Sequence, residues 1–273
     1  MRLNGESIKY ILDLQKNMLP LVYCCANTER LITLKDTINH YNGRLSYKDN
    51  KEVDLINTLL IFFDELNSEG ILDIEKSLIA VNKRGIVLLE ANGIDLMINK
   101  RNLALSIINR YNINVIKGTK SEIEALIKFQ EDNKADDINN ENCKTKFRNF
   151  SKKNNSIIII KNDNYYITDG YSDFTIKSNK NILCNSDILD DIYTGMIAVS
   201  IGVCKSKEEM IQAILIATMA FYIGEKIVIS NFENDKSIKS KDIETCILNE
   251  IYKIDIDKIK SYGDICYFFK RDI

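Results

Sequence analysis

The sequence predicts an α/β protein in which helices cover both faces of a mainly parallel sheet. Short apolar segments, each long enough for one strand, alternate with segments whose apolar residues recur at helical spacing, a pattern typical of βαβ units. The chain has 273 residues, of which 45% are hydrophobic, enough for one large domain with a substantial core. No linker or internal repeat divides the sequence, so we expect residues 1–273 to form a single domain.

Five short apolar segments are the predicted strands of the sheet: Leu21–Cys25, Thr58–Phe63, Gly85–Leu89, Asn114–Lys117 and Ile157–Ile160. Their lengths and apolar composition are typical of strands buried on both faces. A hairpin is expected at Asp169-Gly170, between Tyr165–Thr168 and Asp173–Ile176, because this dipeptide favours a tight turn between strands.

Helices are expected where apolar residues recur every three or four positions: Ser7–Met18, Glu29–His40, Leu72–Lys83, Asn99–Tyr111, a helix opened by Ser121 as its N-cap, Ile192–Cys204, Met210–Gly224 and Lys241–Tyr252. Pro20 ends the first of them. Lys128–Asn155 is the most polar part of the chain, so we expect it to be an exposed, mobile excursion. Asn231–Ser240 is expected to be a loop.

Composition and charge argue against several classes of protein. The net charge is −2 and the pI about 5.7, and no basic face is expected that could bind nucleic acid. The seven cysteines are irregularly spaced without a CxxC pair, which argues against a zinc site and fits a reducing cytoplasm. The N-terminus lacks a signal-peptide core, and the longest apolar stretches fall short of a span of about 20 residues. We therefore expect a cytoplasmic protein without membrane contact.

Functional residues are expected at one edge of the sheet. In sheets of this kind ligands bind beyond the carboxyl ends of the parallel strands. The segments concerned are the loops after Cys25, Phe63, Leu89, Lys117 and Ile160, and the segment before Ile192.

These segments carry motifs that resemble those of the hydroxyethylthiazole kinase family. Pro20–Asn27 reads PLVYCCAN where the family has P-L-V-H-C-I-T-N, and Glu90–Gly93 reads EANG where the family has D-P-V-G. Val115–Ile123, VIKGTKSEI, resembles V-I-R-G-N-x-x-E-I. Ile157–Asp169 resembles the V-I-A-I-T-G strand and hairpin, and Ile182–Gly202 aligns with the stretch around G-T-G-C. The chain is therefore identified as a divergent member, which implies a ribokinase-like fold.

The resemblance implies ATP-dependent phosphorylation of 4-methyl-5-(2-hydroxyethyl)thiazole, with Mg²⁺, in thiamine salvage, and a homotrimer. In the family a glycine-rich turn that opens a helix holds the ATP phosphates. The residues at that turn here are Ile188, Leu189, Asp190 and Asp191. Both glycines are gone, and two carboxylates stand where phosphate should bind. We therefore expect weak or absent ATP binding.

Acidic and basic residues at these loops receive roles from the same resemblance. Asp191 stands where the wider ribokinase-like group has a general base; alternatively it caps the following helix, together with Asp187 and Asp190. Glu122 and Glu90 match acidic positions linked to Mg²⁺; either could instead be a helix-start or surface carboxylate.

The remaining predicted site residues contact ATP or substrate. Lys117 and Lys161 stand at positions that contact the nucleotide, although Lys161 could also lie exposed. On the substrate side Asn27 is retained, and Tyr47 (or Ser46) stands where a Met closes over the thiazole. Ile188 is also assigned to the substrate side.

The pocket loops differ from the family in bulk and charge. Phe62–Leu66, FFDEL, replaces N-I-G-T-L, so the usual thiazole alcohol should not fit in the usual way. Phe62 and Phe63 could also be plain core residues, and His40, the only histidine, is expected on the surface.

Three functions stay open at the level of the sequence. The chain could be a kinase for the thiazole alcohol, a catalytically inactive pseudoenzyme that serves as a binding or scaffold protein, or a kinase for another small alcohol. Measuring nucleotide binding with and without Mg²⁺ would separate the first reading from the second.

Overall fold

A nine-stranded sheet forms the centre of the computed structural model, which describes residues 5–47, 55–64, 67–81, 85–131, 143–162, 164–177, 187–234, 240–261 and 266–269. Its strands lie in the order β2-β1-β3-β4-β5-β6-β7-β8-β9. The bounds are Leu21–Cys25 (β1), Arg44–Ser46 (β2), Thr58–Ile61 (β3), Ile86–Glu90 (β4), Val115–Thr119 (β5), Ile157–Lys161 (β6), Asn164–Thr168 (β7), Asp173–Lys177 (β8) and Cys266–Phe269 (β9). β1 to β6 pair in parallel, and β7 to β9 continue the sheet antiparallel.

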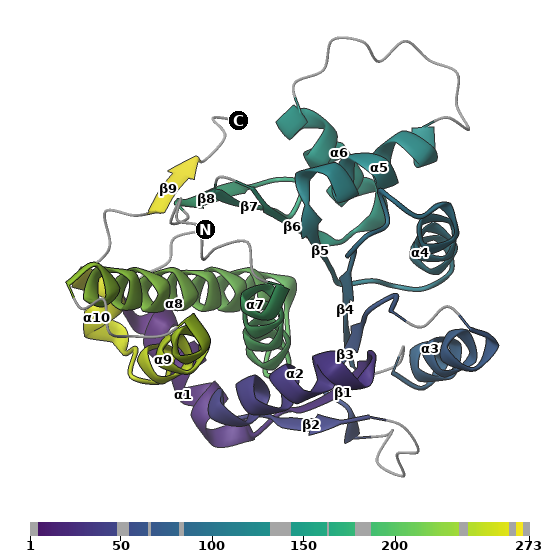
Figure 1. The fold of residues 1–273 in the computed structure, drawn as a ribbon. Coiled ribbons are helices and arrows are strands. Elements are labelled where there is room, and N and C mark those ends of the chain that lie inside the picture. Colours follow the sequence, from purple (N-terminus) through teal and green to yellow (C-terminus); the bar gives the residue numbers. More distant parts are fainter. Residues whose placement is uncertain are drawn as a thin grey trace.

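Helices cover both faces of this sheet (Figure 1). Their bounds are Gly5–Met18 (α1), Thr28–His40 (α2), Ser68–Val81 (α3), Ile98–Arg110 (α4), Lys120–Glu131 (α5), Cys143–Asn154 (α6), Asp187–Ile201 (α7), Lys207–Asn234 (α8), Ser240–Tyr252 (α9) and Ile256–Ser261 (α10). α3 to α6 lie on one face, and α1, α2, α7, α8 and α9 on the other. Successive strand residues point to opposite faces, so Cys24 joins the core under α7 while Cys25 joins the core under α3.

The five predicted parallel strands and the hairpin are confirmed, with small differences at their ends. β3 ends at Ile61, although the Phe62 N–H still donates to the Cys25 carbonyl oxygen at 3.0 Å. Both Phe62 and Phe63 are buried in the core, and His40 is exposed. The sequence reading missed the strands β2 and β9 and the helix α10, which are too short to show a period.

The prediction of an exposed excursion over Lys128–Asn155 is wrong for its second half. Cys143–Asn154 forms helix α6, which buries Phe147, Phe150 and Ser151; residues 132–142 lie outside the described part. Phe147 and Phe150 lie three positions apart and therefore on the same side of α6, so they bury one face of a helix that is otherwise polar. The predicted loop Asn231–Ser240 is also too long, because α8 continues to Asn234; residues 235–239 are not described.

The N-cap predicted for α5 is also wrong. The helix begins at Lys120, so Ser121 lies inside it. Thr119 occupies the cap: its hydroxyl accepts from the Glu122 N–H at 3.4 Å, and the Glu122 carboxylate accepts from the Thr119 N–H at 2.7 Å. This reciprocal pair is a capping box.

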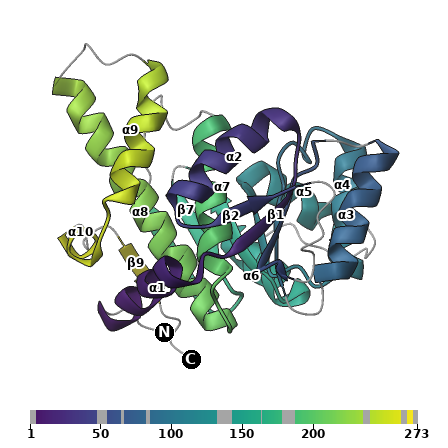
Figure 2. The ribbon, with the colours of Figure 1, turned by 90° about the horizontal axis from the view of Figure 1, so that it is seen from below.

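Helix α8 is longer than the apolar stretch suggested. It has 28 residues, and its Lys207–Asn231 part is long and apolar enough to cross a membrane. Of the most apolar stretch in this part, 78% is buried inside the protein. This burial is what a core helix shows, and one such helix among the described residues is weak evidence for a membrane span. α9 packs beside the far part of α8, as Figure 2 shows.

Candidate functional site

Charged residues from four elements meet where the parallel strands end at the first turn of α7. Glu90 is the last residue of β4, Lys117 lies in β5 and Lys161 ends β6. Because these strands are parallel neighbours, their carboxyl ends lie at one edge of the sheet. Asp190, in the first turn of α7, closes this edge. We call these four residues the lysine cluster.

Lys117 is the centre of the lysine cluster. Its side chain is 1% exposed, and its Nζ donates to Glu90 Oε2 at 2.8 Å and to Asp190 Oδ2 at 2.9 Å. Lys161 Nζ donates to the other oxygen of Asp190 at 3.1 Å. The hydroxyl of Thr194, one turn further along α7, lies 2.9 Å from Glu90 Oε2 and 2.8 Å from the Asp190 carbonyl oxygen. The Asp190 carboxylate therefore bridges both lysines.

Burial and charge pull the pKa values of the lysine cluster in opposite directions. Burial alone lowers the pKa of Lys117, but Asp190 and Glu90 outweigh it and leave that pKa above its ordinary value. Burial likewise favours neutral Asp190, yet Lys117 and Lys161 lower its pKa to about 2. For Glu90 burial wins over Lys117 and raises the pKa to about 7. Asp190 is thus the permanent anion of the cluster, while Glu90 titrates near neutrality.

A second ion-pair group surrounds Arg30 on α2. Its guanidinium Nε donates to Asp64 Oδ2 at 2.9 Å, and its Nη1 donates to Asp191 Oδ1. The guanidinium carbon also lies 4.3 Å from the centre of the Phe62 ring, a cation–π distance. Burial raises the pKa of Asp191 to about 6, although Arg30 lowers it. Arg30 therefore links α2, the loop after β3 and the start of α7.

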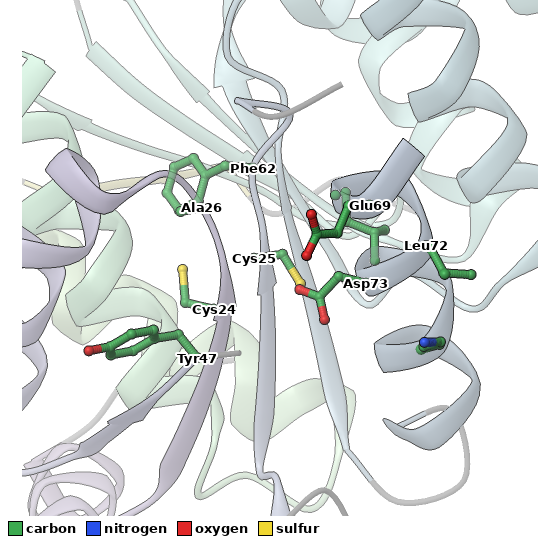
Figure 3. Close-up of a pocket in the computed structure, with 11 residues that line it drawn as sticks. Cys24, Cys25, Ala26, Tyr47, Phe62, Glu69, Leu72 and Asp73 are labelled. Carbon is green, nitrogen blue, oxygen red and sulfur yellow. The ribbon is translucent and has the colours of Figure 1, made fainter. Parts of the chain in front are cut away.

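A cavity of about 180 Å³ opens beside this second group, between the end of β1 and helix α3 (Figure 3). Its buried wall is formed by Cys24, Cys25, Phe62 and Ile74. Its outer wall is formed by Ala26, Tyr47, Glu69, Gly70, Leu72, Asp73 and Lys76. Phe62 lines the cavity and also contacts Arg30, so the paired Arg30 lies between the cavity and the first turn of α7.

The predicted metal residues are held by other partners. Both oxygens of Glu122 accept backbone N–H groups, from Gly93 at 2.6 Å and from Thr119 at 2.7 Å. Glu90 Oε2 is bound to an ammonium group and a hydroxyl. Within the described ranges no group of three His, Cys, Asp or Glu side chains gathers so as to hold a metal ion without other ligands. Because Glu122 and one oxygen of Glu90 are engaged by protein donors, a Mg²⁺ placed here would be held largely by water and by phosphate oxygens of a nucleotide.

The model of the hydroxyethylthiazole kinase family matches residues 54–257, three quarters of the chain. The chain belongs to the hydroxyethylthiazole kinase family. Comparison with curated protein sequences gave no significant match.

Solved structures show the same fold. Hydroxyethylthiazole kinase from Pyrococcus horikoshii OT3 is similar with a TM-score of 0.81 and 16% identity, covering 98% of this chain and 100% of that one. A ribokinase-like superfamily protein from Enterococcus faecalis V583 gives a TM-score of 0.59 and 11% identity, over 89% and 94% of the two chains. Pyridoxal kinase from Staphylococcus aureus, in complex with AMP-PCP and pyridoxal, gives a TM-score of 0.53 and 11% identity, covering 74% of this chain and 86% of that one. The fold is therefore ribokinase-like.

Against the pattern of the hydroxyethylthiazole kinase family, the main departure is at the start of α7. The helix begins at Asp187, so the four residues that match G-T-G-C are its second to fifth residues. The carboxylates of Asp190 and Asp191 accept from Lys117, Lys161 and Arg30 on other elements. This pairing holds them by tertiary contacts, which the simple capping interpretation did not include.

The structure brings together four of the residues to which the family resemblance assigned roles: Glu90, Lys117, Lys161 and, one residue beyond Asp190, Asp191. Glu122 lies close enough to Glu90 to raise the pKa of that carboxyl, and Asn27, Tyr47 and Ile188 lie around this group. Asn27 is the N-cap of α2, with its side-chain oxygen accepting from the Arg30 N–H at 2.9 Å. Tyr47 lines the cavity, and Ile188 is 39% exposed on α7.

Two residues of the site, Arg30 and Asp64, received no role from the sequence. Arg30 belongs to a helix face that reads as ordinary surface, and only the fold places it opposite Asp64 and Asp191. The one available signal was the acidic loop after β3, where Asp64 replaces a small residue of the family pattern. An added buried acid requires a cation nearby, because a lone buried charge is costly.

Proposed function

We propose that this member of the hydroxyethylthiazole kinase family binds a small molecule in the cavity and does not transfer phosphate from ATP. The observation that carries the proposal is the Asp190 carboxylate, which bridges Lys117 and Lys161 at 2.9 and 3.1 Å. These are the two cations to which the resemblance assigned nucleotide contacts. A carboxylate fixed between them offsets one of their two positive charges, occupies a donor of each lysine and would repel an incoming phosphate.

A second observation supports separate ligand and phosphate sites. The ion pairs of Arg30 with Asp64 and Asp191 lie between the cavity and the lysine cluster. Breaking a buried ion pair by moving one partner away costs about 3–5 kcal/mol. A ligand in the cavity would therefore be kept apart from a phosphoryl donor at α7.

Calorimetric titration with ATP, with and without Mg²⁺, tests this proposal. We expect no measurable binding by the wild type at millimolar ATP. Asp190→Gly should bind, because it frees both lysines and restores a glycine in the first turn of α7. Asp187→Gly is the matched control: it makes the same change in the same turn, but Asp187 is exposed and contacts neither lysine. Micromolar binding by the wild type, unchanged in Asp190→Gly, would refute the proposal.

Phosphoryl transfer to a small alcohol is the second candidate, and the pKa of Asp191 favours it. A carboxyl whose pKa is raised to about 6 is closer to the value at which a general base works well at neutral pH. The test is ADP release with ATP, Mg²⁺ and 4-methyl-5-(2-hydroxyethyl)thiazole. Turnover by the wild type that disappears in Asp191→Asn would favour this candidate over the first.

We also propose that the chain forms one domain and assembles as a homotrimer in the cytoplasm, as the family resemblance implies. Three successive apolar residues between β4 and the start of α4, Leu96, Met97 and Ile98, are 85%, 53% and 61% exposed. Such a stretch supports coverage by a second copy of the chain. Light scattering measures the mass: a monomer at micromolar concentration would contradict the assembly.

A further inference from the structure

The cavity beside β1 has the size of one ring. An engineered apolar cavity of about 150 Å³ in another protein accepts benzene, and this cavity measures about 180 Å³. It can therefore hold one five- or six-membered ring with short substituents. Its buried wall, with Phe62 2% and Ile74 2% exposed, offers the apolar surface that such a ring would cover.

The charges of the cavity are unequal. Glu69 and Asp73 both line it from α3; they lie four residues apart and so on the same side of the helix. Figure 3 shows both carboxylates directed toward Cys25 on β1. The remaining charged lining residue is Lys76, which is exposed. Two carboxylates against one ammonium leave a net negative cavity.

The carboxylates keep free acceptor positions. Asp73 accepts from the Tyr23 hydroxyl at 3.1 Å and from the buried Cys25 thiol, whereas a carboxylate can accept about four hydrogen bonds. In the described part of the chain no hydrogen bond or ion pair engages the Glu69 side chain. Burial and Asp73 raise the pKa of Tyr23 far above its ordinary value, so this hydroxyl stays a donor to Asp73.

We propose that the cavity binds a small organic cation: one flat ring that carries a protonated nitrogen group such as an amidinium. The N–H groups donate to Asp73 and Glu69, and the ring packs against Phe62. This inference names the ligand class of the binding function proposed above and rests on it. A neutral ring alcohol offers one donor at most and would leave the negative cavity uncompensated.

Benzamidine, which is cationic at neutral pH, is the probe, and benzamide is its neutral analogue. Calorimetry should give a Kd for benzamidine at least about tenfold lower than for benzamide, since hydrogen bonds between charged groups are the stronger ones. Asp73→Asn keeps an acceptor for Tyr23 but removes the charge, and should raise the Kd for benzamidine about tenfold. Lys76→Gln should lower this Kd, because it removes the positive charge that opposes a cationic ligand.

The control is Glu75→Gln, on the same helix, whose carboxylate pairs with Arg110 at 3.0 Å and does not line the cavity. It should bind benzamidine like the wild type. Should Asp73→Asn unfold, Glu69→Gln provides the same test. Equal affinity for benzamidine and benzamide, or equal losses in Asp73→Asn and Glu75→Gln, would overturn the inference. Micromolar ATP binding by the wild type in the earlier titration would refute the absence of phosphoryl transfer, and the comparison of benzamidine with benzamide would still test the ligand class of the cavity.

Discussion

Glu90→Gln should remove much of the pH dependence of stability between pH 5 and 8. Glu90 is 2% exposed, and burial raises its pKa from 4.5 to about 7 in the folded protein. Between these two values the folded state holds the proton more tightly than the unfolded chain. The free energy of unfolding therefore falls as the pH rises through this window.

The magnitude follows from the two pKa values. One unit of pKa difference corresponds to about 1.4 kcal/mol, and integrating the two titrations from pH 5 to 8 gives a loss on the order of 2 to 3 kcal/mol for Glu90. The glutamine keeps the shape and can still accept from Lys117 and Thr194, but it does not titrate. The pH dependence of the variant should therefore be shallower by roughly 2 to 3 kcal/mol over this range.

Urea denaturation at pH 5, 6, 7 and 8 measures this difference. Contributions from carboxyls distant from Glu90 cancel when the slopes of variant and wild type are subtracted. Glu124→Gln is the control, because it removes an exposed carboxylate that lies 3.7 Å from Lys120. Parallel pH profiles for Glu90→Gln and the wild type would refute the placement of Glu90 as a buried group that titrates near neutrality.

Two further predictions concern elements that the sequence reading placed wrongly. Thr119→Val removes the hydroxyl that caps α5 and should lower the free energy of unfolding by about 1 kcal/mol, measured by urea denaturation; Ser121→Ala should cost less, and the reverse order would contradict the capping box. Phe150→Ala should cost about 3–5 kcal/mol, because Phe150 is 4% exposed in α6. An effect below about 1 kcal/mol, as for a surface residue, would mean that α6 does not pack on the sheet.

The sequence determined the strands and most of the helices because their signals are local. Leu21–Cys25 and Ile157–Lys161 are almost continuous runs of apolar residues, and such a composition predicts a strand that is buried on both faces. The same locality explains the failures. Arg44–Ser46 is a strand only because β1 lies beside it, and Phe147 and Phe150 become core residues only because α6 reaches the sheet.

The sequence by itself also placed Glu90, Lys117, Lys161 and Asp191 near one edge of the sheet, because parallel strands bring their carboxyl ends together. It did not determine which charges pair. The pairing of Asp190 with two lysines, and of Arg30 with Asp64 and Asp191, joins residues far apart in the chain. Only the tertiary structure decides such pairs, because electrostatic energy depends on distance and burial, which a sequence does not contain.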